Sequence, residues 1–130
     1  MVCALARIFN ATLLEDQIQM AGPEDVRRIA LSFDGVVDES APDRLAFSVP
    51  GKQGFAWTWL ERVHPKKPRV PRLEVLAVRC PLGRKEILLE AASDIYFEDA
   101  HYAGFPAILV RLDAIPDDEL IALMKDAWRL

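Results

Sequence analysis

The residues best suited to chemistry lie in one short, basic, proline-rich segment. Between Arg62 and Arg72 the chain carries five Lys or Arg side chains and no Asp or Glu, although its formal net charge is -4. Prolines stand at positions 65, 68 and 71, the three-residue period of a polyproline II helix, and Lys66, Arg69 and Arg72 repeat at the same interval. A stiff spur of this kind suits a polyanion. The alternative is a solvated loop whose prolines only prevent it from pairing.

A second candidate cluster surrounds His101. His101 and Tyr102 are close in sequence to Glu98 and Asp99, a set that could hold a metal or transfer a proton. The chain has two histidines and two distant cysteines, without the ligand spacing of a zinc site. It has no nucleophile elbow and no glycine-rich phosphate loop either. We therefore expect no catalytic residue, no metal and no cofactor, and a local hydrogen bond for His101.

Composition favours an ordinary globular protein. The 130 residues fit one domain, and no apolar run approaches the roughly 20 residues of a membrane span. We expect a cytoplasmic protein without membrane contact, since two distant thiols make no disulfide framework and no secretory signal is evident. A helix opening at Pro23-Glu24-Asp25 suggests that residues 1–19 are an N-terminal extension and residues 20–130 a single domain.

The spacing of apolar residues predicts three helices and several strands. Helices are expected at 23–33 and 84–92 and from Pro116 to the C-terminus. Strands are expected at 45–49, 55–63, 73–80 and 107–112, with a polar connection at 36–44 and no resolved strand within 95–102. The second and third strands, with the basic segment between them, form a hairpin with a protruding tip, the shape of a wing. At least one of Trp57 and Trp59 is expected in the core under the C-terminal helix.

Two stretches resemble the MmcQ/YjbR family. One is Pro23-Glu24-Asp25-Val26-Arg27-x-Ile29-Ala30-Leu31; the other includes His101-Tyr102-x-Gly104-Phe105-Pro106-x-Ile108-Leu109-Val110-Arg111-Leu112. The resemblance implies an α+β fold, an antiparallel sheet with helices packed on one face in the order α-β-β-β-α-β-β-α, similar to frataxin-like and secretion-chaperone-like architectures. That family is described as DNA-binding through paired wings on the sheet, and it brings no catalytic residue.

Two functions are expected on these grounds. The first is contact with the phosphates of double-stranded DNA, with little sequence specificity, by a wing whose cations are Arg62, His64, Lys66, Lys67, Arg69 and Arg72, joined by Arg84 and Lys85 if the following helix lies alongside. The second is a non-catalytic protein- or ligand-binding module that uses the sheet surface. Either would act as a monomer or small homo-oligomer. An enzyme ranks third, because it requires Glu98, His101 and Tyr102 to line a pocket.

Overall fold

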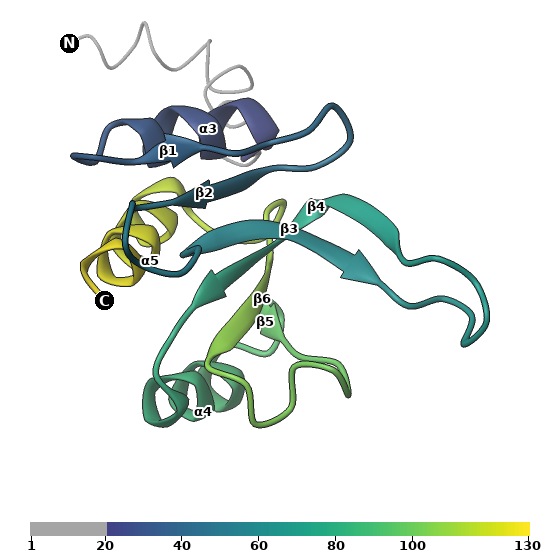
Figure 1. Cartoon of the computed structure of the whole chain (residues 1–130). Coiled ribbons are helices and arrows are strands. Elements are labelled where there is room, and N and C mark those ends of the chain that lie inside the picture. Colours follow the sequence, from purple (N-terminus) through teal and green to yellow (C-terminus); the bar gives the residue numbers. More distant parts are fainter. Residues whose placement is uncertain (1–20) are drawn as a thin grey trace, which may run out of the picture.

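The computed structural model describes residues 21–130, so the expected extension at 1–19 lies outside the described residues. The described part has three helices packed against one sheet, in the arrangement of Figure 1. The helices are α3 (Pro23–Leu31), α4 (Leu82–Ala91) and α5 (Asp117–Arg129). The strands are β1 (Val37–Asp38), β2 (Ala46–Ser48), β3 (Ala56–Glu61), β4 (Val70–Arg79), β5 (Tyr96–Phe97) and β6 (Ala107–Arg111). None of these helices has the length and apolar character needed to cross a bilayer.

The six strands form one antiparallel sheet in the spatial order β1-β2-β3-β4-β6-β5. The expected α+β class is thereby confirmed, with one strand more than expected before α4. Val37 and Asp38 pair with Ser48 and Phe47 inside the segment that was expected to be a polar connection. Both β1 residues are exposed, so no apolar alternation marks them. The strand that the resemblance implied within 95–102 is β5, which is only two residues long.

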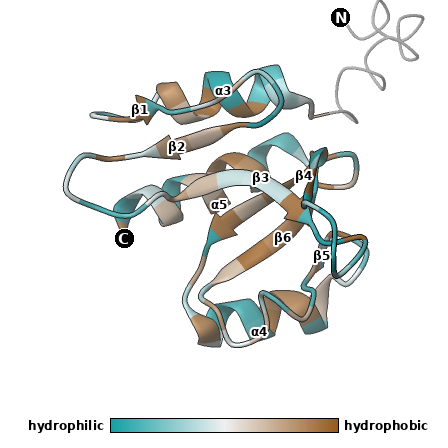
Figure 2. Ribbon diagram, turned by 45° about the vertical axis from the view of Figure 1, so that its right-hand side comes forward, coloured by the Kyte–Doolittle hydropathy of each residue, from teal (hydrophilic) through white to brown (hydrophobic). Residues whose placement is uncertain are grey.

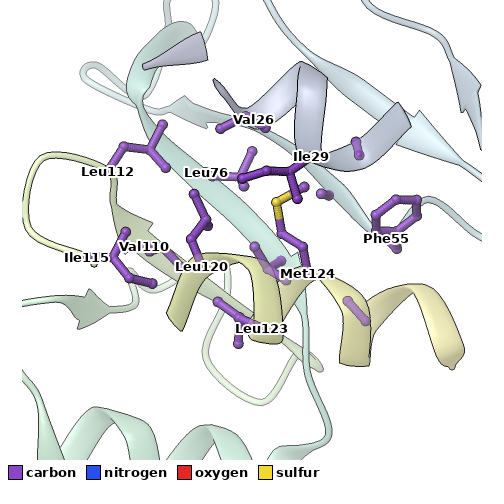
Figure 3. Packing of buried hydrophobic residues seen from close by; sticks show 14 of the residues in the cluster. Val26, Ile29, Phe55, Leu76, Val110, Leu112, Ile115, Leu120, Leu123 and Met124 are labelled. Carbon is purple, nitrogen blue, oxygen red and sulfur yellow. The ribbon is translucent and has the colours of Figure 1, made fainter. Parts of the chain in front are cut away.

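Helices α3 and α5 cover one face of the sheet and enclose the main core. In Figure 3, Val26 and Ile29 of α3 face Leu120 and Met124 of α5, and all four lie over Leu76 of β4. The start of α3 is fixed locally: Pro23 needs no hydrogen-bond partner there, and the Asp25 carboxylate accepts a bond of 2.9 Å from the Gly22 amide. That amide, with Arg28, holds the pKa of Asp25 below its usual range.

The opposite face of the sheet carries a second, smaller cluster that none of the three described helices covers. It consists of Val75, Ala77, Tyr102, Ala107 and Leu109, with Trp57, Trp59 and Phe97 packed against it. Figure 2 shows how hydrophobic β6 is along its length, as expected for a strand buried on both faces. The expectation that Trp57 or Trp59 lies under the C-terminal helix is wrong. In β3, Ala56 and Thr58 are the buried residues, so the tryptophans point to the other face.

Lys85 holds the segment that covers this second face. It is the buried residue of α4, with 2% of its surface exposed. Its Nζ donates to the carbonyl oxygens of Tyr102 at 2.6 Å and Phe105 at 2.9 Å, and lies 2.7 Å from a Glu98 carboxylate oxygen. A buried amine is tolerated only when its donors are satisfied in this way. The side chain therefore ties the 98–106 loop to α4.

Replacing Lys85 with Met tests this tie. The substitution K85M keeps the volume but leaves two carbonyls and one carboxylate without their donor, so we expect the free energy of unfolding to fall by about 3–5 kcal/mol. Urea denaturation followed by circular dichroism measures it. The matched control is K125M on an exposed position of α5, expected to change stability by less than about 0.5 kcal/mol. A loss below about 1 kcal/mol for K85M would show that the loop does not depend on this amine.

Candidate nucleic-acid interface

The outer halves of β3 and β4 leave the sheet as a two-stranded arm. The pairing of Thr58 with Leu76 is followed by Trp59 with Arg72, so residues 73–75 of β4 have no partner in β3. Beyond this irregularity only the β3–β4 pairing continues, to Glu61 opposite Val70. Neighbouring β2 and β6 end before it. Irregularities of this kind bend a strand and redirect its remaining residues. In Figure 1 the arm reaches away from the helices.

The tip of the arm is a turn and not a polyproline spur. The Lys67 amide donates to the His64 carbonyl at 3.1 Å, and the Lys66 amide donates to His64 Nδ1, also at 3.1 Å. After the turn, Val70–Arg72 already belong to β4. The expectation of one continuous spur is therefore wrong, because strand pairing takes over its second half. Pro71 lies inside the paired arm, where it removes an edge donor and discourages further strand pairing.

Four cations of the arm have no carboxylate partner among the described residues. The Lys66 and Lys67 side chains belong to exposed residues. Arg62 bonds only carbonyl oxygens of the turn, at 3.1 Å from Lys67 and 3.4 Å from Pro65. Arg69 contacts the Leu60 carbonyl and His101 Nδ1, each at 3.4 Å. These contacts orient the two guanidinium groups without neutralising them.

Arg72 differs from these four because it pairs with Glu61 across the arm at 2.7 Å. The pair cancels most of the charge that Arg72 was expected to contribute. It also fastens the two strands where each has lost its other neighbour. Arg72 thus has a structural partner at hand, and its strength as a phosphate ligand depends on breaking that pair.

Arg84 and Lys85 do not extend the basic surface. Both belong to α4, which follows the end of β4 remote from the tip. Arg84 pairs with Asp126 of α5 at 2.6 Å. The expectation that Lys85 contacts phosphate is contradicted by its burial, since its amine is enclosed by the 98–106 loop. The described structure therefore does not bring the cations from Arg62 to Lys85 onto one continuous face.

The 98–106 loop braces the arm against the body. Trp59 Nε1 donates to the Asp99 carboxylate at 3.1 Å. The Trp59 ring also meets the Phe97 ring edge-on, with ring centres 5.3 Å apart. Arg69 and His101 make the contact nearest the tip. A bare two-stranded hairpin is marginal in water, so these contacts are what give the arm a fixed direction. The sequence predicted a tryptophan of β3 in the core under the C-terminal helix and a local hydrogen bond for His101. Instead, Trp59 bonds Asp99, which is 40 residues away along the chain, and His101 contacts Arg69, which is 32 residues away.

The candidate acid–base residues are each engaged with a different partner. The Tyr102 hydroxyl accepts a hydrogen bond of 3.0 Å from Trp57 Nε1, and burial raises its pKa. Glu98 lies against Lys85, and His101 faces Arg69. Tyr102 caps the second cluster, whereas Phe105 is 39% exposed. The His101 ring also meets the Tyr102 ring edge-on, with ring centres 5.3 Å apart.

A second hairpin, β1–β2, turns at the same end of the sheet as the arm. Its connection lies next to β3, where the Thr58 amide donates to the Leu45 carbonyl at 3.0 Å. Its charges differ from those of the arm: Asp38 pairs with Arg27, Asp43 pairs with Arg44, and Glu39 bonds Ser48. Of the two hairpin tips, only the β3–β4 tip is basic.

Comparisons with known proteins agree with this architecture. No curated protein matches the chain. One solved structure with the same fold is that of Deinococcus radiodurans protein DR2400, which contains a DUF419 domain. It is 20% identical, with a TM-score of 0.62, and the match covers 86% of this chain and 79% of that one. The family model described as YjbR matches residues 31–130, which include every strand, α4 and α5. The chain belongs to the YjbR family.

Proposed function

We propose that this protein is a non-catalytic DNA-binding protein that contacts the phosphates of a duplex with the tip of the β3–β4 arm. The observation that carries the proposal is the set of four unneutralised cations, Arg62, Lys66, Lys67 and Arg69, on a braced hairpin in a chain of net charge -4. Such a group of cations is suited to the phosphates of a nucleic acid, because each contact with a phosphate releases a condensed counterion.

The remaining charge distribution supports an oriented approach. Residues 61–72, which form the outer part of the arm, contain five basic side chains and one acidic one, whereas residues 86–130 contain three basic and ten acidic ones. A polyanion therefore attracts the arm and repels the C-terminal part of the chain. The tip is a turn, and its cations offer contacts to phosphates more than to base edges. Binding should accordingly depend little on DNA sequence.

The second candidate is a protein-binding module that uses the second face of the sheet, beside the 98–106 loop. The observation in its favour is the half-buried aromatic surface beside the 98–106 loop. There the Arg111 guanidinium lies 4.2 Å from the centre of the Phe97 ring, and the Arg79 guanidinium lies 5.5 Å from that of Trp57. A bound partner that survives nuclease treatment and high salt would favour this candidate over the first.

Removing the two tip lysines should weaken DNA binding and reduce its salt dependence. With four phosphates contacted, the logarithm of the association constant should fall with log salt at a slope of about -3.6. K66Q/K67Q should bring the slope to about -1.8. Fluorescence anisotropy with a short duplex, between 50 and 200 mM salt, measures both. K52Q/K125Q has the same net charge, changes exposed lysines outside the arm and should retain the wild-type slope. Equal slopes for both double variants would remove the arm from the proposal.

Loosening the brace should affect affinity without changing the number of contacts. W59F keeps an aromatic ring against Phe97 but loses the 3.1 Å hydrogen bond to Asp99. The loss should lower the free energy that holds the arm against the loop by about 1 kcal/mol. We expect faster amide exchange in the arm and DNA affinity reduced by up to about fivefold at an unchanged salt slope.

The matched control for this brace is W57F. It removes an equivalent indole bond, to Tyr102, but leaves the contacts of the arm intact. It should therefore leave amide exchange at the tip as in the wild type. Indistinguishable exchange at the tip in W59F and W57F would show that Asp99 does not hold the arm.

A further inference from the structure

The leading end of the β3–β4 arm is apolar, although cations surround it. The turn at the tip runs from His64 to Lys67, whose amide donates to the His64 carbonyl at 3.1 Å. Pro65 and Lys66 are its two central residues, and proline is favoured at the first of these positions because its ring presets the backbone. Val63, directly before the turn, has 60% of its surface exposed. A proline ring and an isopropyl group are therefore exposed where the arm ends.

The main chain of this turn has few polar groups left for a base edge. Pro65 has no amide N–H, and the Lys66 amide donates to His64 Nδ1 at 3.1 Å. The Arg62 guanidinium reaches across the turn and donates to the carbonyls of Pro65, at 3.4 Å, and Lys67, at 3.1 Å. Because these groups are already bonded within the turn, its main chain is poorly suited to reading bases by hydrogen bonds. Apolar contact is the interaction that remains for Pro65 and Val63.

The cations lie on both sides of this apolar end. Arg62 precedes the turn, and Arg69 follows it on the returning side, where it contacts the Leu60 carbonyl at 3.4 Å. The two phosphate rows of a duplex are closest across the minor groove, which is roughly 6 Å wide against roughly 12 Å for the major groove. A single turn with charge on both sides therefore fits the minor groove better, because it can reach both rows at once.

The tip is also stiff enough to push against a base pair. Arg62 ties two carbonyls of the turn together, and Pro65 and Pro68 each fix one backbone angle. Behind the tip, Trp59 fastens the arm to Asp99 at 3.1 Å. A stiff tip loses little conformational freedom when it inserts, so more of the contact energy is available to deform the DNA.

We propose that the tip enters the minor groove and that Pro65, with Val63 beside it, inserts as a wedge at one base step and bends the duplex. This inference rests on the DNA contact proposed above and adds to it the deformation of the DNA. Proline and aliphatic side chains are the groups that minor-groove proteins insert between base pairs. The deformation costs least at a flexible pyrimidine–purine step, and less still at a nick, where one strand is interrupted. The preferred ligand is therefore DNA that bends easily or is already bent.

Energy transfer between dyes at the two ends of a duplex measures the bend. The probe has about 20 base pairs with a central TA step, and a second probe carries a nick at that step. Saturation with the full chain should shorten the end-to-end distance of the intact probe, as a bend of about 40° or more requires. The nicked probe should bind about tenfold more tightly than the intact one, because its deformation costs less.

The double variant V63T/P65A removes the wedge without changing the charge. The matched control V37T/P42A makes the same substitutions on the β1–β2 hairpin. There Val37 is 42% exposed, and Pro42 is exposed at the same position of the turn between Ala41 and Arg44. The control should bend the duplex like the wild type. V63T/P65A should keep the wild-type salt slope but leave the duplex straight and prefer the nicked probe by less than about twofold.

The outcomes separate this inference from DNA binding itself. Salt-dependent binding without any shortening of the duplex would overturn the wedge and leave the phosphate contact standing. An equal bend with V63T/P65A and the wild type would do the same. If P65A disturbs the turn and alters the salt slope, V63T alone decides, and it should reduce the preference for the nicked probe to about threefold. Absence of salt-dependent binding to either probe would overturn both proposals.

Discussion

The length of β4 is the constraint on which the rest of the structure depends. Its ten residues span roughly 33 Å, whereas β6 pairs only with Val75–Arg79 and β3 loses register after Thr58. Helices α3 and α5 pack over the inner part of the sheet, so the outer part of β4 has only one neighbour and leaves the core as an arm. The basic tip lies directly before the first residue of this strand, at the end that no helix of the described residues covers.

An arm with one partner strand needs outside support, and the 98–106 loop provides it. Lys85 of α4 holds the loop in place by donating to two of its carbonyl oxygens and pairing with Glu98. The loop then presents Asp99 to Trp59 and His101 to Arg69. The most specific part of the family resemblance, around His101 to Pro106, is thus structural: it closes the second face of the sheet and gives the arm its direction.

Local neutralisation decides which cations remain for a ligand. The chain is acidic as a whole, yet six of its cations have no carboxylate partner in the described residues. They are Arg62, Lys66, Lys67 and Arg69 at one end of β4, and Lys52 and Arg79 at the other. Arg72 and Arg84 stand close by in sequence but are paired with Glu61 and Asp126. Counting charges along the chain does not separate these two groups, because pairing depends on neighbours across the fold.

The sequence by itself determined the α+β class, the three helices, the protruding hairpin and the family, because these depend on local periodicity, turn residues and short motifs. It missed β1 and left β5 unresolved, since two-residue strands carry no period. Only the tertiary structure decided that Lys85 is buried, that Arg84 lies away from the arm, and that Trp57 and Trp59 face the loop. Those outcomes depend on which segments meet across the sheet, and long-range packing is not encoded in the spacing of neighbouring residues.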